Sequence, residues 1–453
     1  MGRSLAIRTR VLRAGAASAL AVAACSSACS SEGDGAAPPL TGPTVNHVLS
    51  TGQSNSIGFA ARTVLSVEQP YENLMFDTGV IVAKSCDDEG CREYETPTAL
   101  VPLVEGDHYF DEPVETMSSG LANEVGLLAS GRERHDVLVT VHGRSGNVYE
   151  CLRKGGCAFQ DNKGYVKAFD DALREMKDAH RLANAAGRPY VVRAVTAIHG
   201  ESDHYDKDFP LDGSDGAKRA LASYSDALLE WQRDYEAAVH AETKQKDHVP
   251  LLISQMANWN DRPDSEIPIL QLDAHVRAPG KVVLIGPTYM LPFAADCIHY
   301  TSEGERRLGE YFGKAYAKII LDKGTWEPLR PTSVTLADRT ITARFAVPSP
   351  PLVLDTERVT DPGAYGFEYV DDGPDTPFIE RVELAGEDAV TITLSAAPTA
   401  QKRHLRYALR ATPQTCPGPK TGPRGNLRDS DETPSQTGVS LANWAVSFDA
   451  PIR

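Results

Sequence analysis

Between about residues 45 and 323, short apolar runs alternate with stretches whose apolar residues recur every three or four positions. The short runs are rich in Val, Ile and Leu without clean polar alternation, which is typical of strands buried on both faces. We expect strands at 45–50, 137–142, 190–198, 249–255 and 282–286, and helices around 169–180, 217–239 and 302–321. Strands that alternate with helices predict an α/β fold with a parallel sheet covered on both sides.

Beyond Trp326 the pattern changes to an alternation of period two. Apolar residues occupy every second position near 341–347, 390–394 and 405–409, and Pro and Gly clusters separate these runs. This pattern predicts a β-sandwich domain over 327–453. Trp444 and Tyr407 fall within such runs, so we expect them in the core rather than as platforms for sugar rings.

The segment of about 60–115 interrupts the rhythm of the first part. It is rich in acidic and aromatic residues and contains Cys86 and Cys91. Two interpretations stay open: a lid or substrate wall, and a surface excursion without a role in binding.

The first residues are typical of an export signal, with four arginines before a short run of small and apolar residues. Residues 1–24 are expected to be a lipoprotein signal peptide, because Val22-Ala23-Ala24-Cys25 resembles a bacterial lipobox with Cys25 as the lipidated residue. An ordinary secretory signal cut near Ala24 or Ala28 is the alternative. Residues 25–43 are rich in Ser, Gly, Ala and Pro and are expected to be a flexible tether. We therefore expect an exported lipoprotein that faces the periplasm or the extracellular space and touches the membrane only through this anchor.

The composition of the chain limits the classes of binding partner and cofactor that we expect. The formal charge of −16 disfavours nucleic acid and anionic membrane surfaces. Eight cysteines suit an exported protein, and Cys86/Cys91 and Cys151/Cys157 are spaced to close short disulfide loops. Cys297 and Cys416 are then either bridged or free, since six cysteines allow 15 pairings. Neither short spacing matches a zinc-ligand pattern, so we expect no metal and no cofactor.

Two segments suggest nucleophilic catalysis. Ser54 lies in Gly-Gln-Ser-Asn at 52–55, directly after the first expected strand, where a tight turn presents a hydroxyl to a cleft. His299 follows Asp296 by three residues, which is close enough for the carboxylate to hold the ring. Ser302 and Glu305 follow at capping-box spacing, which places this pair on the loop before the last helix.

Two further polar segments follow expected strands. Residues 199–203, His-Gly-Glu-Ser-Asp, come after the strand at 190–198, and residues 143–147, Gly-Arg-Ser-Gly-Asn, come after the strand at 137–142. Glycines at such a position can turn backbone N–H groups toward an oxyanion. Each segment alone is more simply a polar turn, but their joint placement at one sheet edge favours an active site.

In this order the four segments resemble the signature blocks of the SGNH (GDSL-like) hydrolase superfamily, and more narrowly its sialate O-acetylesterase and carbohydrate esterase family 6 branch. Gly-Gln-Ser-Asn and Asp-x-x-His match that branch, whereas His199 replaces the glutamine of its Gln-Gly-Glu-x-Asp block. The resemblance covers about 45–323, with an esterase domain over 44–323. It implies a flavodoxin-like sheet, deacetylation of sugar hydroxyls and no metal.

The resemblance also implies residue roles. Ser54 is the nucleophile, His299 the general base and then acid, and Asp296 its partner. The oxyanion and substrate set comprises the N–H of Ser54 and of Gly146 or Gly143, with His199, Gln53, Asn55 and Glu201 around them. Glu201 and Asp203 are read mainly as buried acceptors that shape their turn.

We therefore expect a carbohydrate O-acetylesterase. A lipase- or thioesterase-like enzyme on the same scaffold is one alternative, and a non-catalytic surface protein that binds carbohydrate is another. Trp259, just past a strand, weakly favours sugars but is equally readable as a core residue.

Overall fold

The computed structural model describes residues 40–82, 86–87, 90–91, 94–107, 112–161, 164–206 and 209–453. The expected signal peptide, Cys25 and most of the tether lie outside these residues, as do the side chains of Cys86 and Cys91. Leu40 to Arg453 form one compact unit, so the two expected domains pack together. In the described part of the chain, no helix combines the length and apolar character that crossing a bilayer requires.

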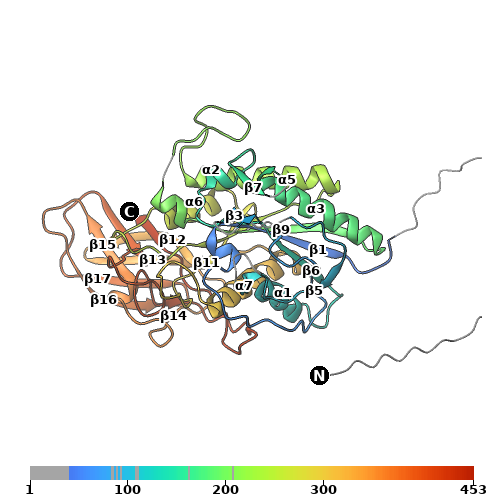
Figure 1. Cartoon of the computed structure of the whole chain (residues 1–453). Coiled ribbons are helices and arrows are strands. Elements are labelled where there is room, and N and C mark those ends of the chain that lie inside the picture. Colours follow the sequence, from blue (N-terminus) through green and yellow to red (C-terminus); the bar gives the residue numbers. More distant parts are fainter. Residues whose placement is uncertain are drawn as a thin grey trace, which may run out of the picture. The chain divides into compact units, whose positions relative to one another are not determined.

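A seven-stranded sheet with order β11-β10-β9-β1-β6-β2-β5 forms the centre of the first part (Figure 1). All five expected strands are present and parallel, which confirms the α/β prediction. Two short strands extend the sheet beyond β6, and the last is antiparallel. The bounds are β1 Val45–Gly52, β2 Leu74–Phe76, β5 Leu100–Pro102, β6 Asp136–Val141, β9 Tyr190–Ile198, β10 Leu251–Gln255 and β11 Val282–Pro287.

The order of the five parallel strands is that of a doubly wound sheet of the 2-1-3-4-5 type. The chain reverses its winding direction between β1 and β9, so the loops after these two strands diverge at their carboxyl ends. Ligands of such sheets bind at this point. The segments that contain Ser54 and His199 follow these two strands.

Helices cover both faces of the sheet. On one face lie α1 (Met117–Leu128) and α7 (Ser302–Tyr316), and on the other α3 (Ala168–Ala185), α5 (Tyr224–Thr243) and α6 (Ile267–Arg277) (Figure 1). Adjacent residues of β1 point to opposite faces, because Val48 packs in the cluster of α1 and α7 and Leu49 in that of α3 and α5. A Cβ at Gly309 would lie 2.1 Å from the Met117 carbonyl oxygen, so glycine lets α7 approach α1 closely.

The N-cap of the last helix lies one residue earlier than expected. Thr301, not Ser302, is its N-cap, and its hydroxyl accepts a hydrogen bond from the N–H of Gly304 at 3.2 Å. Ser302 instead accepts a hydrogen bond from the N–H of Thr63. Beyond α7, residues Ala317–Leu321 form a π-helical turn, η2.

The segment 60–115 is partly structural, because it contributes β2 and β5 to the sheet. Its end is also fixed, since the buried carboxylate of Glu115 accepts hydrogen bonds from the N–H groups of Leu65 and Ser66. The remaining short elements are η1 Ser54–Ile57, β3 Cys86–Asp87, β4 Gly90–Cys91, α2 Tyr149–Leu152, β7 Ala158–Asp161, β8 Gly164–Lys167 and α4 Glu201–Tyr205.

Antiparallel sheets make up the C-terminal part. Four strands pair in the order β12-β13-β17-β16 and three in the order β15-β18-β20, and β14 pairs with β19. The bounds are β12 Arg330–Ala337, β13 Thr340–Ala346, β14 Val353–Leu354, η3 Ala364–Gly366, β15 Phe367–Asp371, β16 Ile379–Ala385, β17 Ala389–Leu394, β18 Arg403–Tyr407, β19 Leu427–Arg428 and β20 Phe448–Pro451.

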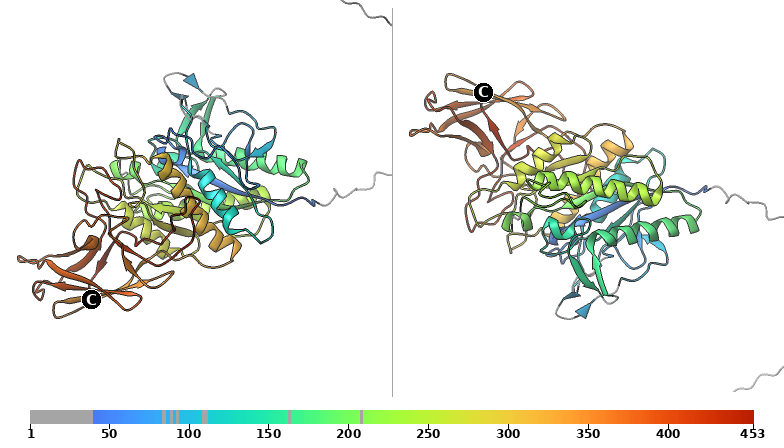
Figure 2. Two further views of the ribbon diagram at one scale, coloured as in Figure 1. Left: turned by 90° about the horizontal axis from the view of Figure 1, so that it is seen from below. Right: turned by 90° about the horizontal axis from the view of Figure 1, so that it is seen from above.

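The C-terminal strands share a hydrophobic core with the α/β part. Figure 2 shows these strands, coloured orange to red, in two further views. Trp444 and Tyr407 are buried in it, which confirms that they are core residues. The hydroxyl of Tyr289, just after β11, donates to the Ala445 carbonyl at 2.7 Å. Among the described residues there are two disulfides, Cys151–Cys157 and Cys297–Cys416, and the second joins the two parts of the chain.

Candidate active site

Ser54 opens the short helix η1 directly after β1 and is 4% exposed. The preceding turn requires glycine at position 52. Gly52 has φ +134°, and a Cβ there would lie 2.1 Å from the Ile198 carbonyl oxygen. The turn is therefore pressed against the end of β9, and this contact fixes where the serine hydroxyl emerges.

A continuous hydrogen-bonded chain links Ser54 to His299 and Asp296. Nε2 of His299 lies 2.7 Å from Oγ of Ser54, and Nδ1 lies 2.7 Å from Oδ2 of Asp296. Oδ1 of Asp296 accepts the N–H groups of Ile298 and His299, each at 3.0 Å. The ring of Phe59 stacks on His299 with 4.5 Å between centroids.

The environment of Asp296 keeps its carboxyl ionised. Partial burial acts to raise its pKa, but the hydrogen bonds from the backbone and ring of His299 and from the N–H of Ile298 outweigh burial and lower it. An ionised Asp296 accepts the Nδ1–H of His299, which leaves Nε2 free to accept the proton of Ser54. The sequence predicted that these three side chains would meet, and the structure brings them within hydrogen-bond distance.

A buried clamp holds the histidine loop. The side-chain N–H₂ groups of Asn55 and Asn258 both donate to the Ile298 carbonyl, at 3.3 and 2.6 Å. The same two groups donate to Oε1 of Glu201, at 3.0 and 2.7 Å. Oδ1 of Asn55 also accepts the N–H of Tyr300. Asn55 thus holds the backbone on both sides of His299, and Glu201 orients the two amides.

Asn258 is a member of this clamp that sequence reasoning missed. It lies just past β10, at the same sheet edge as Ser54, so the rule that found the other segments applied to it too. Its neighbour Trp259 is fully buried and offers no ring face to a substrate, which removes it as a sugar contact.

Gln53 and Asp203 act as structural ties. Oε1 of Gln53 accepts the N–H of Ser202 at 2.8 Å, which joins the turn after β1 to α4. Oδ2 of Asp203 accepts the N–H of Tyr149 at 2.8 Å, and Asp203 is 2% exposed. Gln53 therefore positions the turn, and Asp203 is the buried acceptor that was expected.

His199 is placed differently from the expected oxyanion donor. Nε2 lies 3.0 Å from the Asn147 carbonyl oxygen, and Nδ1 lies 2.8 Å from the Tyr224 hydroxyl. Burial lowers the pKa of His199 to about 4, against the opposing bond to the Asn147 carbonyl, so the ring is neutral near pH 7. A neutral ring has one N–H, and a carbonyl only accepts, so Nε2–H donates to Asn147 and Nδ1 accepts from Tyr224. The only N–H of the neutral His199 ring is thus used in a hydrogen bond to the 143–147 loop and is not available to an oxyanion.

The two candidate glycines lie in different surroundings. A Cβ at Gly143 would lie 1.9 Å from Oγ of Ser56, so this glycine is packed against the turn that contains Ser54. Gly146 has φ +69° and borders open space on its Cβ side. Between them, Arg144 is fully buried and pairs with Asp171 on α3 at 2.5 Å. This ion pair anchors the 143–147 loop to α3. It was not predicted from the sequence.

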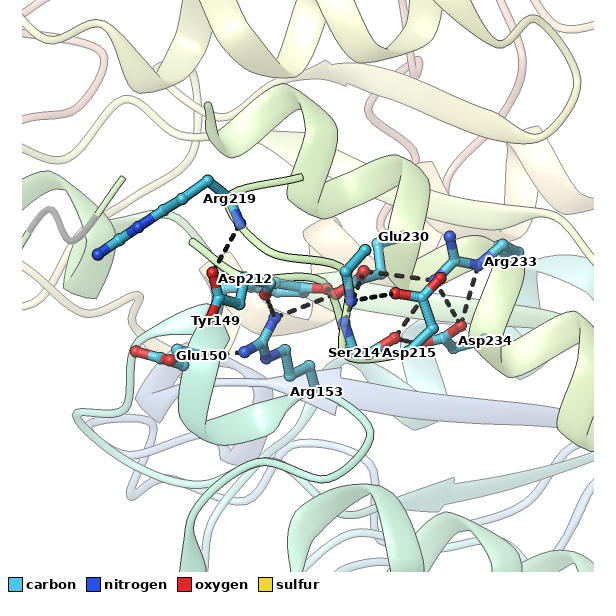
Figure 3. Close-up of polar contacts among 11 residues, drawn as sticks. Tyr149, Glu150, Arg153, Asp212, Ser214, Asp215, Arg219, Glu230, Arg233 and Asp234 are labelled. Atoms are coloured by element: carbon cyan, nitrogen blue, oxygen red, sulfur yellow. Dashed lines mark hydrogen bonds and ion pairs between the residues drawn. The ribbon is translucent and has the colours of Figure 1, made fainter. Parts of the chain in front are cut away.

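A polar cluster fixes the helix that follows the 143–147 loop (Figure 3). Oε1 of the buried Glu230 accepts the hydroxyl of Tyr149 at 2.8 Å and lies 3.3 Å from Nη1 of Arg153. Oε2 of Glu230 accepts the N–H of Ser214 at 2.9 Å. Glu230 therefore ties α2 and the segment before α5 to α5 itself.

Among the described residues, no group of three His, Cys, Asp or Glu side chains is arranged to hold a metal.

Comparison with known proteins shows an esterase-like α/β fold. The chain resembles a carbohydrate acetylesterase from Xanthomonas citri, with a TM-score of 0.50 and 15% identity over 89% of this chain and 80% of that one. The carbohydrate acetylesterase Est24 from Sinorhizobium meliloti matches with a TM-score of 0.32 and 11% identity over 61% and 100%. NanS matches with a TM-score of 0.39 and 11% identity over 62% and 99%. No family model and no curated protein sequence matches the chain.

Proposed function

We propose that the chain is a serine ester hydrolase that removes O-acetyl groups from carbohydrates. The observation that carries this proposal is the pair of 2.7 Å hydrogen bonds that connect Ser54 to His299 and His299 to Asp296. This arrangement activates a hydroxyl for acyl transfer. The site borders solvent on the side of Asp296, whose side chain is 41% exposed, while Ser54 is only 4% exposed.

Catalysis proceeds in two acyl-transfer steps. Oγ of Ser54 attacks the acetyl carbonyl while Nε2 of His299 takes its proton, and Asp296 stabilises the imidazolium. The C–O bond to the sugar then breaks, and His299 returns the proton to the departing sugar oxygen. A water molecule, deprotonated by His299, attacks the acetyl-enzyme and releases acetate and free Ser54.

The oxyanion of each tetrahedral intermediate is held by backbone donors. We assign these to the N–H of Ser54 and the N–H of Gly146 or Gly143. Support comes from the anchoring of the 143–147 loop by the Arg144–Asp171 pair on one side and by the bond of His199 to Asn147 on the other. A fixed donor contributes to the rate because no reorganisation is needed during the reaction.

The carbohydrate substrate rests on the resemblance of the four segments to the sialate O-acetylesterase and carbohydrate esterase family 6 branch. The fold match to a protein described as a carbohydrate acetylesterase is in keeping with it. The intact triad argues against the non-catalytic alternative. A lipase- or thioesterase-like activity is distinguished by acyl-chain preference.

The test is release of acetate from acetylated xylan, O-acetylated sialic acid, acetylated alginate and 4-nitrophenyl acetate. Ser54→Ala should reduce turnover at least ~10³-fold on every substrate, because the nucleophile is lost. Ser333→Ala, at an exposed position of β12, is the matched control and should not change it. Equal activity of Ser54→Ala and the native protein would refute the mechanism. Faster cleavage of octanoyl than of acetyl esters would favour the lipase-like alternative.

We also propose that the enzyme is exported and anchored through a lipid on Cys25. The two disulfides are in keeping with an oxidising compartment. Radiolabelled palmitate should be incorporated into the native chain and not into Cys25→Ala. Equal incorporation into both, or into neither, contradicts the anchor.

A further inference from the structure

A groove of about 690 Å³ lies in the C-terminal part, away from the triad residues. It is bordered by β15 and by the start of β16, which are edge strands of two different sheets. The segment 408–424 closes its remaining side. The side chains that matter for its chemistry are Arg410, Arg424, Glu368, Tyr369 and Phe378.

Arg424 is held in the groove wall without an ionic partner. Its Nε donates to the Thr360 carbonyl at 2.8 Å, and Nη1 donates to the Gly422 carbonyl at 2.9 Å. Within the described residues, no carboxylate is recorded at ion-pair distance from it. Burial lowers the pKa of Arg424, and the charge of nearby Asp361 only opposes that effect. A partly buried guanidinium without a counter-ion is costly, and an anion bound in the groove would offset that cost.

A second guanidinium and an aromatic ring border the same groove. The side chain of Arg410 is 80% exposed and lies 3.5 Å from Oε1 of Glu368, a separation at the long end for an ion pair. Phe378 is 68% exposed, the largest exposure among the large apolar side chains of the described chain. Planar guanidinium groups bind carboxylates through two parallel hydrogen bonds, and exposed aromatic rings offer a flat apolar face. Together they fit a ring-shaped ligand that bears a carboxylate.

The groove is connected to the catalytic loop by a single segment. Thr412 and Arg424 line the groove, and Cys416 between them is bonded to Cys297, with 4.5 Å between their Cα atoms. Thr412 precedes Cys416 by four positions, so the groove begins within roughly 15 Å of the Cα atom of Cys416. An oligosaccharide that occupies both the groove and the catalytic site would have to span this distance and the further distance from Cys416 to Ser54.

We propose that this groove is a subsite for a carboxylate-bearing sugar of the substrate, with Arg424 and Arg410 binding the carboxylate and Phe378 packing on the ring. The inference rests on the proposed function in taking the ligand to be part of the same acetylated carbohydrate. Uronic acids and sialic acids share this chemistry, and the binding test distinguishes them. Arg424 gains the anionic partner that the protein does not provide.

Binding is measured by titration calorimetry on full-length Ser54→Ala, with trigalacturonate, sialyllactose and xylotriose as probes. One acidic probe should bind at least ~10-fold more tightly than neutral xylotriose, and Arg424→Gln and Phe378→Ala should each weaken that binding ~10-fold or more. Arg381→Gln, at an exposed arginine of β16 outside the groove, is the matched control and should bind normally. Thermal unfolding of each variant verifies its fold, and the exposed Arg410→Gln replaces Arg424→Gln if the latter is destabilised.

Hydrolysis separates this inference from the proposed function. Arg424→Gln should raise KM for an acetylated acidic polymer ~10-fold and leave hydrolysis of 4-nitrophenyl acetate unchanged. Binding of an acidic probe without any esterase activity in the native protein would retain the subsite and reject the proposed function. Equal binding of xylotriose and both acidic probes, or unaltered binding in all groove variants, overturns the subsite.

Discussion

Cys297, which lies between Asp296 and Ile298, forms a disulfide with Cys416 from the C-terminal part, 119 residues further along the chain. The bond attaches the loop that bears His299 to a segment with its own anchors, since the N–H of Gln414 donates to the Asn260 carbonyl. Covalent attachment beside the general base restricts how far Asp296 and His299 can move. The disulfide therefore helps to position the proposed catalytic pair.

Replacement of both cysteines, Cys297→Ala with Cys416→Ala, should lower kcat for 4-nitrophenyl acetate roughly 10-fold, because small displacements of a general base reduce its rate contribution steeply. It should also lower the free energy of unfolding by about 2–4 kcal/mol, since the disulfide closes a long loop. Steady-state kinetics and chemical denaturation measure the two effects.

The second disulfide provides the matched control. Cys151–Cys157 closes a loop with a separation of only 6 residues, and neither cysteine is adjacent in sequence to Ser54, Asp296 or His299. Cys151→Ala with Cys157→Ala should leave kcat nearly unchanged and affect stability less. Equal losses of kcat in the two double variants would contradict a specific role of Cys297–Cys416.

Asn258→Ala removes the shorter of the two hydrogen bonds to the Ile298 carbonyl. Because Asn55 keeps a bond of 3.3 Å to the same oxygen, the loop should loosen without unfolding. We expect kcat to fall roughly 10- to 100-fold with little change in KM.

A double-mutant cycle tests whether the clamp acts as a unit. The side chains of Asn55 and Asn258 donate to the same two acceptors, Glu201 and the Ile298 carbonyl. The effects of Asn55→Ala and Asn258→Ala on kcat should therefore not add. Additive effects in the cycle, or a change confined to KM, would show that the two amides act independently of the His299 loop.

His199 should influence the rate through the 143–147 loop rather than as a direct donor. His199→Gln retains an N–H₂ group that can reach the Asn147 carbonyl and should preserve most of kcat. His199→Ala removes that bond and should lower kcat by about 10-fold, less than the ~10²–10³ that follows loss of an oxyanion donor. A loss of ~10²-fold or more in both variants would instead indicate direct contact with the oxyanion.

The order of the chain and its hydrophobic pattern were sufficient to predict the five central parallel strands and the meeting of Ser54 with His299, but not the short strands β2 and β5. Strands buried on both faces have a strong apolar signal, and their carboxyl ends share one edge. Short-range patterns were also informative, since Asp296 and His299 are three residues apart. Trp444 and Tyr407 were correctly assigned to the core because they lie in runs where apolar residues alternate with other residues.

Features that depend on contacts between distant segments were not predictable. The helix α1 is rich in polar residues and glycines, so its sequence does not have a clear helical pattern. The close packing of α7 against α1 at Gly309 is visible only in the structure. Asn258 is an unremarkable polar residue until Glu201 and the Ile298 carbonyl are placed beside it. The role of His199 likewise depends on Asn147, whose carbonyl fixes the tautomer, and on Tyr224, whose hydroxyl adapts to it.

Glu230 should be important for stability. Its buried carboxylate accepts hydrogen bonds from Tyr149, Arg153 and Ser214 (Figure 3). Glu230→Ala leaves a largely buried guanidinium and two other donors without this acceptor, and should lower the free energy of unfolding by about 3–5 kcal/mol. Glu387→Ala, at an exposed turn, is the control for chemical denaturation. A loss below about 1 kcal/mol for Glu230→Ala would mean that water replaces the carboxylate.

The buried carboxyl of Glu124 makes stability depend on pH. Glu124 lies on α1, is fully buried, and has no recorded hydrogen bond at either carboxylate oxygen in the described structure. Burial and the negative charge of Glu310 raise its pKa from 4.5 to about 8, and Lys314 only partly opposes them. The folded state therefore holds a proton that the unfolded state releases between these two values. This contribution to stability is complete below pH 4.5 and is lost as the pH rises through 8.

Glu124→Gln removes this titration and should flatten the fall in stability with rising pH. We expect the difference in unfolding free energy between pH 5 and pH 8 to shrink by on the order of 1–3 kcal/mol. Denaturation with urea at each pH measures it. Glu133→Gln, at an exposed position after α1, should retain the native slope. A Glu124→Gln profile that runs parallel to the native one would show that this carboxyl is already ionised in the folded state at pH 5.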